Sequence, residues 1–598
     1  MQILYHKSTN LTTVQKYFIE RSVEVLYRGT MDSYRVRVRN PKTILQEVYS
    51  TIVGFEKGQV KHFLTIATKE SNKFSLRDEA IDALKLQPNY LSFKTVTSSY
   101  LLLLLSQLNE YNYKQTKDCL RLVLDENHEY LKAISEGLKT LLQQNPIDDE
   151  ELQQLLKATG TCIGIFFTEL MENGFSKGFL YRYIYGVFIN TLDDSSEFMT
   201  RLDEMIARIN DNQSAYELTF RVDTTSKVID GIQPLQSEVC INDTVTDLDE
   251  LAGNKEFDNF IPPRKNRCFI KCSITAPDYL AALKVAKALI AENLDVLNLG
   301  FPDEYLNVYS RVLVVDTGNK AGAQFQETRN FLDGKYKVAK EHYEGFIEQL
   351  PAINANPRVT QESKDKIKSA VRYLRLGNQS TEVEHKFINY WIGLEYLFSN
   401  YESSNTINRI KDYFVACHSL NYVKRNSFDF FRSVEELRPA ELAQIAAYNI
   451  DPIVSLTNPD FYRQIYDVFL NDHPLLAFRA KTLQGVLRPG EPSTKIKDYI
   501  SKHQKNLMIH FTRIYRLRNE IIHDAATNTN NESIASNLRY YLTFILNGVI
   551  GYLSTSPKEQ NSIEDYFTLN EIYLGNIAHN SFPLNELLKI SSAMDFIV

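Results

Sequence analysis

This 598-residue chain has few cysteines, one tryptophan and no long hydrophobic run. Six cysteines in a chain of this length do not make a disulfide framework. The strongest apolar run, residues 101–105, is far shorter than the ~20 residues that a membrane-spanning helix needs. The sequence also opens without a basic and then apolar leader. We therefore expect no membrane association and a cytoplasmic location.

A positive net charge is also missing, because 67 lysines and arginines face 74 aspartates and glutamates, a formal charge of −7. Such a chain repels phosphate as a whole, so a nucleic-acid binder must gather its cations locally. The sequence contains no Walker loop, no Gly-x-Ser-x-Gly turn and no His-Glu-x-x-His motif. Cys268 and Cys272 have no second ligand pair at zinc spacing, so we predict that they lie in a strand core. We expect no metal and no cofactor.

The composition that remains is that of a folded protein, with 43% hydrophobic and 12% aromatic residues. The length exceeds one ordinary core, so several domains are expected. The predicted fold class is mainly α with a smaller α/β part. We predict four regions: a mostly helical sensing or regulatory region at 1–215, a mixed α/β segment at 216–357, a helical domain at 358–556 and a tail at 557–598 packed on the body.

Hydrophobic periodicity places the elements. The N-terminal region starts with partly strand-like text, such as residues 34–38, and becomes strongly helical from about Val96. Alternating runs at 216–222, 268–274 and 311–316 predict strands, and residues 278–293 predict a helix with Asp278 near its start. No glycine-rich loop follows the first strand of this β–α–β unit, so we favour a scaffold or recognition role. Further helices are expected near 361–376, 381–400, 405–420, 459–470, 494–523 and 531–553.

The segment 505–523 carries the strongest candidate chemistry. On a helix that turns ~100° per residue, its apolar residues share one face, and Arg513, Arg516 and Glu520 lie roughly opposite. Arg518 falls within the apolar face, where a charge must be paired or functional. The apolar face comprises Leu507, Phe511, Ile514, Tyr515, Ile521 and Ile522.

His523 closes this helix and shares a face with Asn519, four residues earlier. Arg518 and His523 are five residues apart, so they diverge by about 140° on an ideal helix. The two side chains can therefore meet at one phosphate only if the helix end distorts or if two copies of the site meet across a dimer.

A second helix, residues 387–398, offers a partner. Phe387, Trp391, Leu394 and Phe398 form its apolar face, with Glu395 at the edge. We hypothesise that Glu395 orients Arg518 or His523. The alternative is that Glu395 pairs with Arg518 only to hold the fold.

The approach to Arg518 is basic. Lys502, Lys505, Arg513 and Arg516 are the candidate RNA-binding residues, and His503 and His510 add donors. The alternative is that these cations only form a solvent-exposed face of the helix and bind no RNA. Within residues 494–523 the cations are Lys495, Lys497, Lys502, Lys505, Arg513, Arg516 and Arg518, against Asp498 and Glu520.

These residues resemble the HEPN superfamily, specifically the ApeA-like group of bacterial defence proteins. The family signature is Arg, a polar residue, three further residues and His, here Arg518-Asn519-x3-His523. Tyr515, Asp524 and the helix with Trp391 and Glu395 are also similar to the family. The resemblance covers roughly residues 358–556, and residues 1–215 match no known family.

The resemblance implies a HEPN-like helical bundle that cleaves RNA without a metal, through attack of the 2′-hydroxyl on the adjacent phosphate. His523 would be the general acid or base, Arg518 would hold the phosphate, and Asn519 would assist. Family sites usually form where two domains meet, so a homodimer is implied. The expected role is abortive-infection defence against phage, with a possible phage-derived trigger. The alternatives are a non-catalytic RNA- or protein-binding module, or the toxin of a toxin–antitoxin pair.

Overall fold

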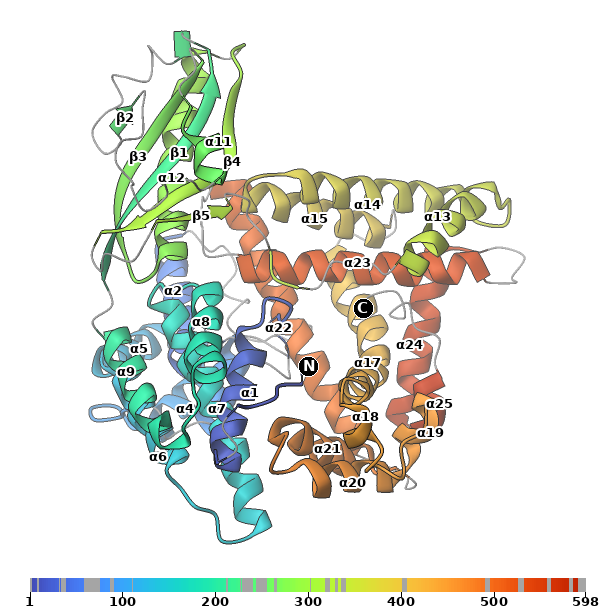
Figure 1. Cartoon of the computed structure of the whole chain (residues 1–598). Helices are drawn as coiled ribbons and strands as arrows, with labels where there is room; N and C mark the ends of the chain where they lie inside the picture. The colour runs from blue at the N-terminus through green and yellow to red at the C-terminus, as the bar shows by residue number, and fades with distance from the viewer. Residues whose placement is uncertain are drawn as a thin grey trace. The chain divides into compact units, whose positions relative to one another are not determined.

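The chain is mostly helical with a smaller antiparallel sheet (Figure 1), which confirms the predicted mainly α chain with a smaller α/β part. No helix in the described part of the chain combines the length and apolar character of a membrane span. The computed structural model describes residues 3–7, 10–31, 33, 39–58, 76–86, 91–109, 111–210, 213–225, 227–228, 240–242, 255–262, 266–301, 303–317, 323–327, 332–334, 340–400, 406–489, 495–524, 532–555, 561–579 and 584–589.

Two compact units make up the chain: residues 1–168 together with 332–598, and residues 169–331. The sequence boundaries at 215 and 357 group the chain differently, because the first helices join the C-terminal helices through contacts between residues as far as 466 positions apart. The helices are α1 (Thr13–Leu26), α2 (Pro41–Glu56), α3 (Leu76–Leu86), α4 (Ser98–Ser106), α5 (Tyr113–Glu126), α6 (Tyr130–Leu142), α7 (Asp149–Glu172), α8 (Lys177–Ile184), η3 (Tyr185–Asn190), η4 (Ser195–Glu197), α9 (Phe198–Asn210), α11 (Lys255–Phe260), α12 (Tyr279–Gly300), α13 (Lys340–Ala355), α14 (Gln361–Gln379), α15 (Val383–Phe398), α16 (Thr406–Arg409), η7 (Ile410–Phe414), α17 (Val415–Glu435), α18 (Pro439–Leu442), α19 (Pro452–Thr457), α20 (Pro459–Phe469), α21 (Pro474–Leu487), α22 (Lys495–Asp524), α23 (Glu532–Thr555), α24 (Ile563–His579) and α25 (Leu584–Lys589).

The smaller unit contains the sheet, with strand order β2-β3-β1-β4-β5 and antiparallel neighbours throughout. Because β3 and β4 are both antiparallel to β1, they run parallel to each other and are joined by α12, so the predicted β–α–β unit is confirmed with β1 between its strands. The strands are β1 (Ser214–Thr224), β2 (Cys240–Asn242), β3 (Arg267–Ala276), β4 (Leu306–Asp316) and β5 (Gln324–Glu327).

Local signals explain the crossover helix α12. The Asp278 carboxylate accepts the backbone N–H groups of Leu280 and Ala281, both at 2.9 Å, and so caps the helix as expected. Ala282 and Ala286 let the helix pack closely on the sheet. Cys268 and Cys272 are buried in β3, which confirms their predicted place in a strand core.

In its described part the N-terminal region has helices from Thr13 onward. Capping explains the first two: Thr12 and Gln15 form a capping box at α1, and Asn40 and Thr43 form another at α2. The partly strand-like stretch at residues 34–38 lies outside the described residues.

The predicted C-terminal helices correspond to α14, α15, α16 to α17, α20, α22 and α23. The apolar faces of α14, α15, α22 and α23, with η7, form one core that includes Trp391, Phe414, Phe511 and Phe544. A second core, beneath α17 to α21, takes in Ile577 of α24 and Leu587 of α25. The described part of the tail therefore packs on the helical body.

A glycine sets the spacing of α14 and α15. A Cβ at Gly377 would lie 2.3 Å from Cε1 of the buried Tyr390. We expect Gly377→Ala to lower the free energy of unfolding by about 1–3 kcal/mol, because the packed ring has no room to move. Gly485 of α21 has open space around it, so Gly485→Ala should instead stabilise by ~0.5–1 kcal/mol. Chemical denaturation of both variants tests this contrast, and equal effects would contradict it.

Candidate functional site

Helix α22 carries the candidate site. It runs for 30 residues, and Leu507, Phe511 and Ile514 are buried in the core, as predicted. Tyr515 and Ile521 are only partly buried. Ile522 is 47% exposed, so its predicted place on the buried face is wrong. The last turns of the helix therefore emerge from the core where the candidate residues lie.

Arg518 lies at this emerging edge and is partly buried. Its Nη1 donates to Oδ1 of Asn519 at 3.1 Å. Its Nε is shielded from solvent and has no hydrogen-bond partner within the described residues. The structure thus brings Arg518 and Asn519 together and leaves a guanidinium with donors to spare.

The backbone of His523 belongs to α22, but its side chain lies outside the described residues. The helix continues to Asp524 without a break, so the backbone shows none of the end distortion that would bring His523 toward Arg518. On a regular helix, residues five apart still diverge by about 140°. Of the two arrangements expected, the distorted helix end is not seen in the backbone, and the meeting of two copies stays a prediction.

Glu395 has a different partner from the one expected. Its carboxylate accepts the indole Nε1–H of the buried Trp391 at 2.9 Å. Neither Arg518 nor any other described cation pairs with it, so the predicted contact with Arg518, catalytic or structural, is not formed. The alternative contact with His523 involves a side chain outside the described residues. The Trp391 ring in turn packs on the Tyr515 ring, with 6.1 Å between the two ring centroids. Glu395 is therefore linked to α22 through Trp391, which packs on Tyr515 of that helix.

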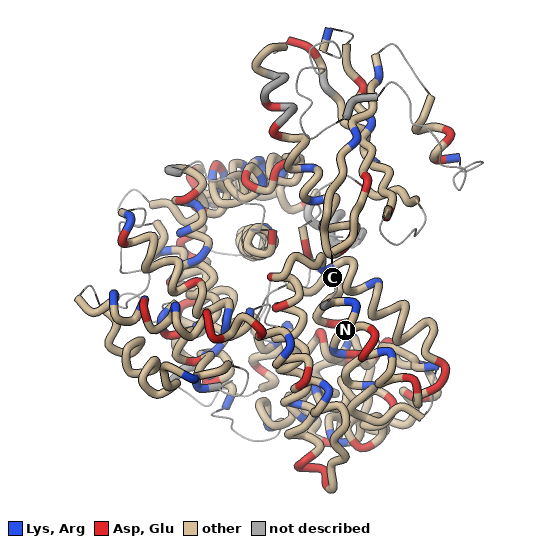
Figure 2. The backbone as a smooth tube through the Cα atoms, turned by 90° about the vertical axis from the view of Figure 1, so that its left-hand side faces the viewer, with Lys and Arg blue, Asp and Glu red and all other residues tan. Residues whose placement is uncertain are grey.

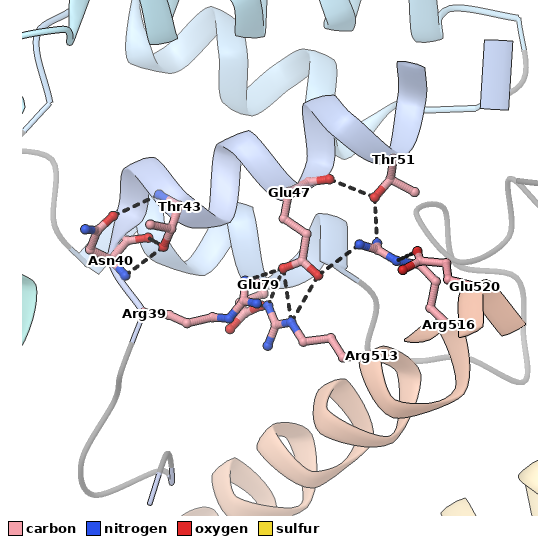
Figure 3. A network of polar contacts seen from close by, with 9 residues as sticks. All are labelled: Arg39, Asn40, Thr43, Glu47, Thr51, Glu79, Arg513, Arg516 and Glu520. Atoms are coloured by element: carbon pink, nitrogen blue, oxygen red, sulfur yellow. Dashed lines mark hydrogen bonds and ion pairs between the residues drawn. The ribbon is translucent and has the colours of Figure 1, made fainter. Parts of the chain in front are cut away.

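The basic face of α22 is covered by acidic residues of α2 and α3 (Figure 3). Arg513 donates from Nη2 to Glu47 at 2.8 Å and also bonds Glu79. Arg516 donates to the Thr51 hydroxyl at 2.6 Å and lies 3.6 Å from a Glu47 oxygen. Lys505 pairs with Asp82, whereas Lys502 is exposed.

This pairing corrects the prediction of an open phosphate-binding surface. The Arg513 side chain is only 4% exposed, and Lys505, Arg513 and Arg516 all have carboxylate partners. Elsewhere, too, lysines and arginines stand among aspartates and glutamates along the helices (Figure 2). In this conformation, Lys502 alone of the four predicted RNA-binding residues is exposed without an ion pair to a described residue.

Neighbouring charges strongly shift the pKa values of Glu47 and Arg513. Burial alone would raise the pKa of Glu47, but the guanidinium groups of Arg39, Arg513 and Arg516 hold it well below its usual value. Burial alone would lower the pKa of Arg513, and the Glu47 and Glu79 carboxylates instead raise it. Glu47 and Arg513 are therefore both charged at neutral pH. The sequence offers no local pattern that links Glu47 or Glu79 to α22, so the prediction missed them.

His503 and His510 are core residues, so their predicted role as phosphate donors is wrong. His503 Nε2 lies 2.8 Å from Nδ1 of His418, and the Tyr422 ring stacks on His503. His510 Nδ1 lies 2.6 Å from the Tyr541 hydroxyl. Burial lowers the pKa of His418 and His503 well below the usual histidine value, and the charge of Arg425 lowers both further.

These buried histidines predict a loss of stability in mild acid. The folded state keeps His418 and His503 neutral, whereas the unfolded chain takes up protons below pH ~6.5. The free energy of unfolding should thus fall as pH drops from 7.5 to 5.5, by up to ~1.4 kcal/mol per pH unit for each histidine. His418→Gln should flatten this slope, and His128→Gln, at an exposed histidine, should not. Denaturation at several pH values measures both, and an unchanged slope in His418→Gln would contradict the assignment.

The bond between Trp391 and Glu395 can be tested through the chain's one tryptophan. Glu395→Ala leaves a buried indole N–H unpaired, so we expect a shifted tryptophan emission and a loss of about 1–3 kcal/mol in stability. Glu395→Gln keeps an acceptor and should cost less. Equal emission and stability in the two variants would show that the carboxylate does not hold the indole.

Comparisons of this chain with protein-family models, with curated proteins and with solved structures found no match.

Proposed function

We propose that this chain is a metal-independent endoribonuclease of the HEPN type, with Arg518, Asn519 and His523 as its active residues. We further propose that it acts in the cytoplasm in abortive-infection defence against phage, after a trigger acts on the remainder of the chain. RNA is the proposed substrate, and the working form is a homodimer.

One contrast within α22 supports the proposal most. Arg513 and Arg516 are paired with carboxylates, whereas Arg518 makes only a hydrogen bond to Asn519 and keeps a shielded Nε without a partner among the described residues. A partly buried guanidinium held against an apolar face and lacking a counter-ion is suited to bind an anion. The phosphate of RNA is the anion that the family resemblance favours.

The chemistry follows from these residue types. A base takes the proton from the 2′-hydroxyl, the 2′-oxygen bonds to phosphorus, and the bond to the 5′-oxygen breaks as an acid protonates that oxygen. The products are a 2′,3′-cyclic phosphate and a 5′-hydroxyl. Histidine suits both proton transfers near neutral pH. Arg518 would offset the charge that develops on the phosphate oxygens.

A dimer supplies what one copy lacks. Residues 518 and 523 diverge on the continuous helix α22, and one histidine cannot be base and acid at the same moment. Two copies of the helix end, facing each other, would offer an arginine of one copy to the histidine of the other and two histidines in all. The exposed Ile522 at this end is suited to such a contact.

The non-catalytic alternative loses one of its supports. It explained Arg518 by an ion pair with Glu395, but Glu395 binds Trp391 instead. A toxin with a separate antitoxin remains compatible with the same active residues.

Cleavage assays on total RNA, in excess EDTA, test the proposal. We expect wild type to leave cyclic phosphate ends, and Arg518→Ala and His523→Ala to cut at least ~100-fold more slowly. Arg463→Ala, at an exposed arginine of α20, is the matched control and should cut like wild type. Equal cleavage by wild type and His523→Ala would remove His523 from the mechanism.

A further inference from the structure

A stripe of cations on α22 is occupied by carboxylates from α2 and α3. Lys505, Arg513 and Arg516 fall within about 80° of the helix circumference. Lys505 pairs with Asp82 of α3. Arg513 pairs with Glu79 of α3 and Glu47 of α2, and Arg516 with Glu47 and Thr51 of α2 and with Glu520 of α22 itself, 3.3 Å away (Figure 3). The pairing extends over three turns and ends at Arg516, two residues before Arg518.

The centre of this stripe is closed to solvent. The side chains of Arg513, Glu79 and Glu47 are 4%, 6% and 10% exposed. Arg513 binds Glu47 from two nitrogens, with Nε–Oε1 and Nε–Oε2 distances of 3.2 and 3.0 Å beside the Nη2 bond. Its Nη1 is buried and has no partner within the described residues. The guanidinium is thus held by two carboxylates and still has a donor to offer.

Carboxylate and phosphate oxygens compete for the same groups. Both accept charge-assisted, often bidentate hydrogen bonds from arginine, and both bind the lysine ammonium. Arg518 lies about 140–160° around the helix from this stripe. An RNA backbone that bound the stripe and curved around the last turns of α22 to Arg518 would need the cations that Glu47, Glu79 and Asp82 now hold.

We propose that α2 and α3 form an autoinhibitory clasp, an internal acidic stand-in for the RNA backbone that keeps Lys505, Arg513 and Arg516 from RNA. This inference rests on the proposed nuclease function, since it names the regulation of that same site. Separation of α2 and α3 from α22 exposes the stripe to RNA.

The test measures RNA binding apart from cleavage. In the full chain carrying His523→Ala, the double variant Glu47→Gln with Glu79→Gln weakens the clasp and keeps side-chain size. Glu56→Gln is the matched control, because Glu56 is also on α2 but pairs with Lys117 of α5. Fluorescence anisotropy with a labelled single-stranded RNA, at stepwise salt, gives the Kd and its salt dependence.

We expect the double variant to bind RNA about tenfold or more tightly than its parent, with the slope of log K against log salt steeper by about 0.7 for each freed cation. Glu56→Gln should match the parent. If the double variant also matches the parent in affinity and slope, the clasp is overturned.

A milder variant covers the case in which the double variant does not fold, as judged by Trp391 emission and circular dichroism. Asp82 is 44% exposed, so Asp82→Asn removes the carboxylate charge that pairs with Lys505 without leaving a buried charge unpaired. If the slope of log K against log salt becomes steeper by about 0.7, the value for one cation, the clasp is supported. An unchanged slope overturns it.

Cleavage by the same variants with His523 intact separates this inference from the proposed function. Faster cleavage by the double variant than by wild type supports both. Tighter binding with no cleavage by any variant keeps the clasp and refutes the nuclease. Wild-type cleavage as fast as that of the double variant keeps the nuclease and refutes the clasp.

Discussion

The buried ion pairs of Arg513 with Glu47 and Glu79 are the constraint on which the larger unit depends. A guanidinium this deeply buried needs carboxylates close by, and removal of one partner from such a pair costs roughly 3–5 kcal/mol. The N-terminal helices α2 and α3 therefore stabilise α22 where it lies in the closed form. Segments more than 400 residues apart fold as one unit for this reason.

Helix α22 serves three purposes because three different surroundings meet along it. Its apolar face, with Phe511 and Ile514, fixes it in the helical core. Its basic face is neutralised by α2 and α3. Its last turns leave both environments, so Arg518 is only partly buried and has no carboxylate partner among the described residues. Rigid support on two sides next to a less supported end is suited to a site that must hold one guanidinium in a fixed direction.

Hydrophobic periodicity predicted the helices, which depend on neighbouring residues, but not the ion pairs between residues far apart in the sequence. The spacing of apolar residues placed α14, α15 and α22, and Asp278 marked the start of α12, because both signals act within a few residues. The partners of Arg513 lie 434 and 466 positions away, and charged side chains carry no mark of their partner. His503 looked like a surface donor because sequence alone does not show that α17 covers it. The bond between Glu395 and Trp391 spans four residues of one helix, so it is a contact that helical spacing alone can predict.

The charge balance links the clasp to regulation. The chain carries −7 overall and has its own carboxylates on the stripe of α22, so the closed form presents RNA with little positive surface near Arg518. Carboxylates within the same chain act at a high effective concentration, which free RNA does not match easily. A trigger can shift this balance only if it binds the open form more tightly than the closed one. The surfaces that differ between the two forms are the acidic faces of α2 and α3 and the basic face of α22. An activating partner must therefore recognise one of them, or a change that is coupled to their separation.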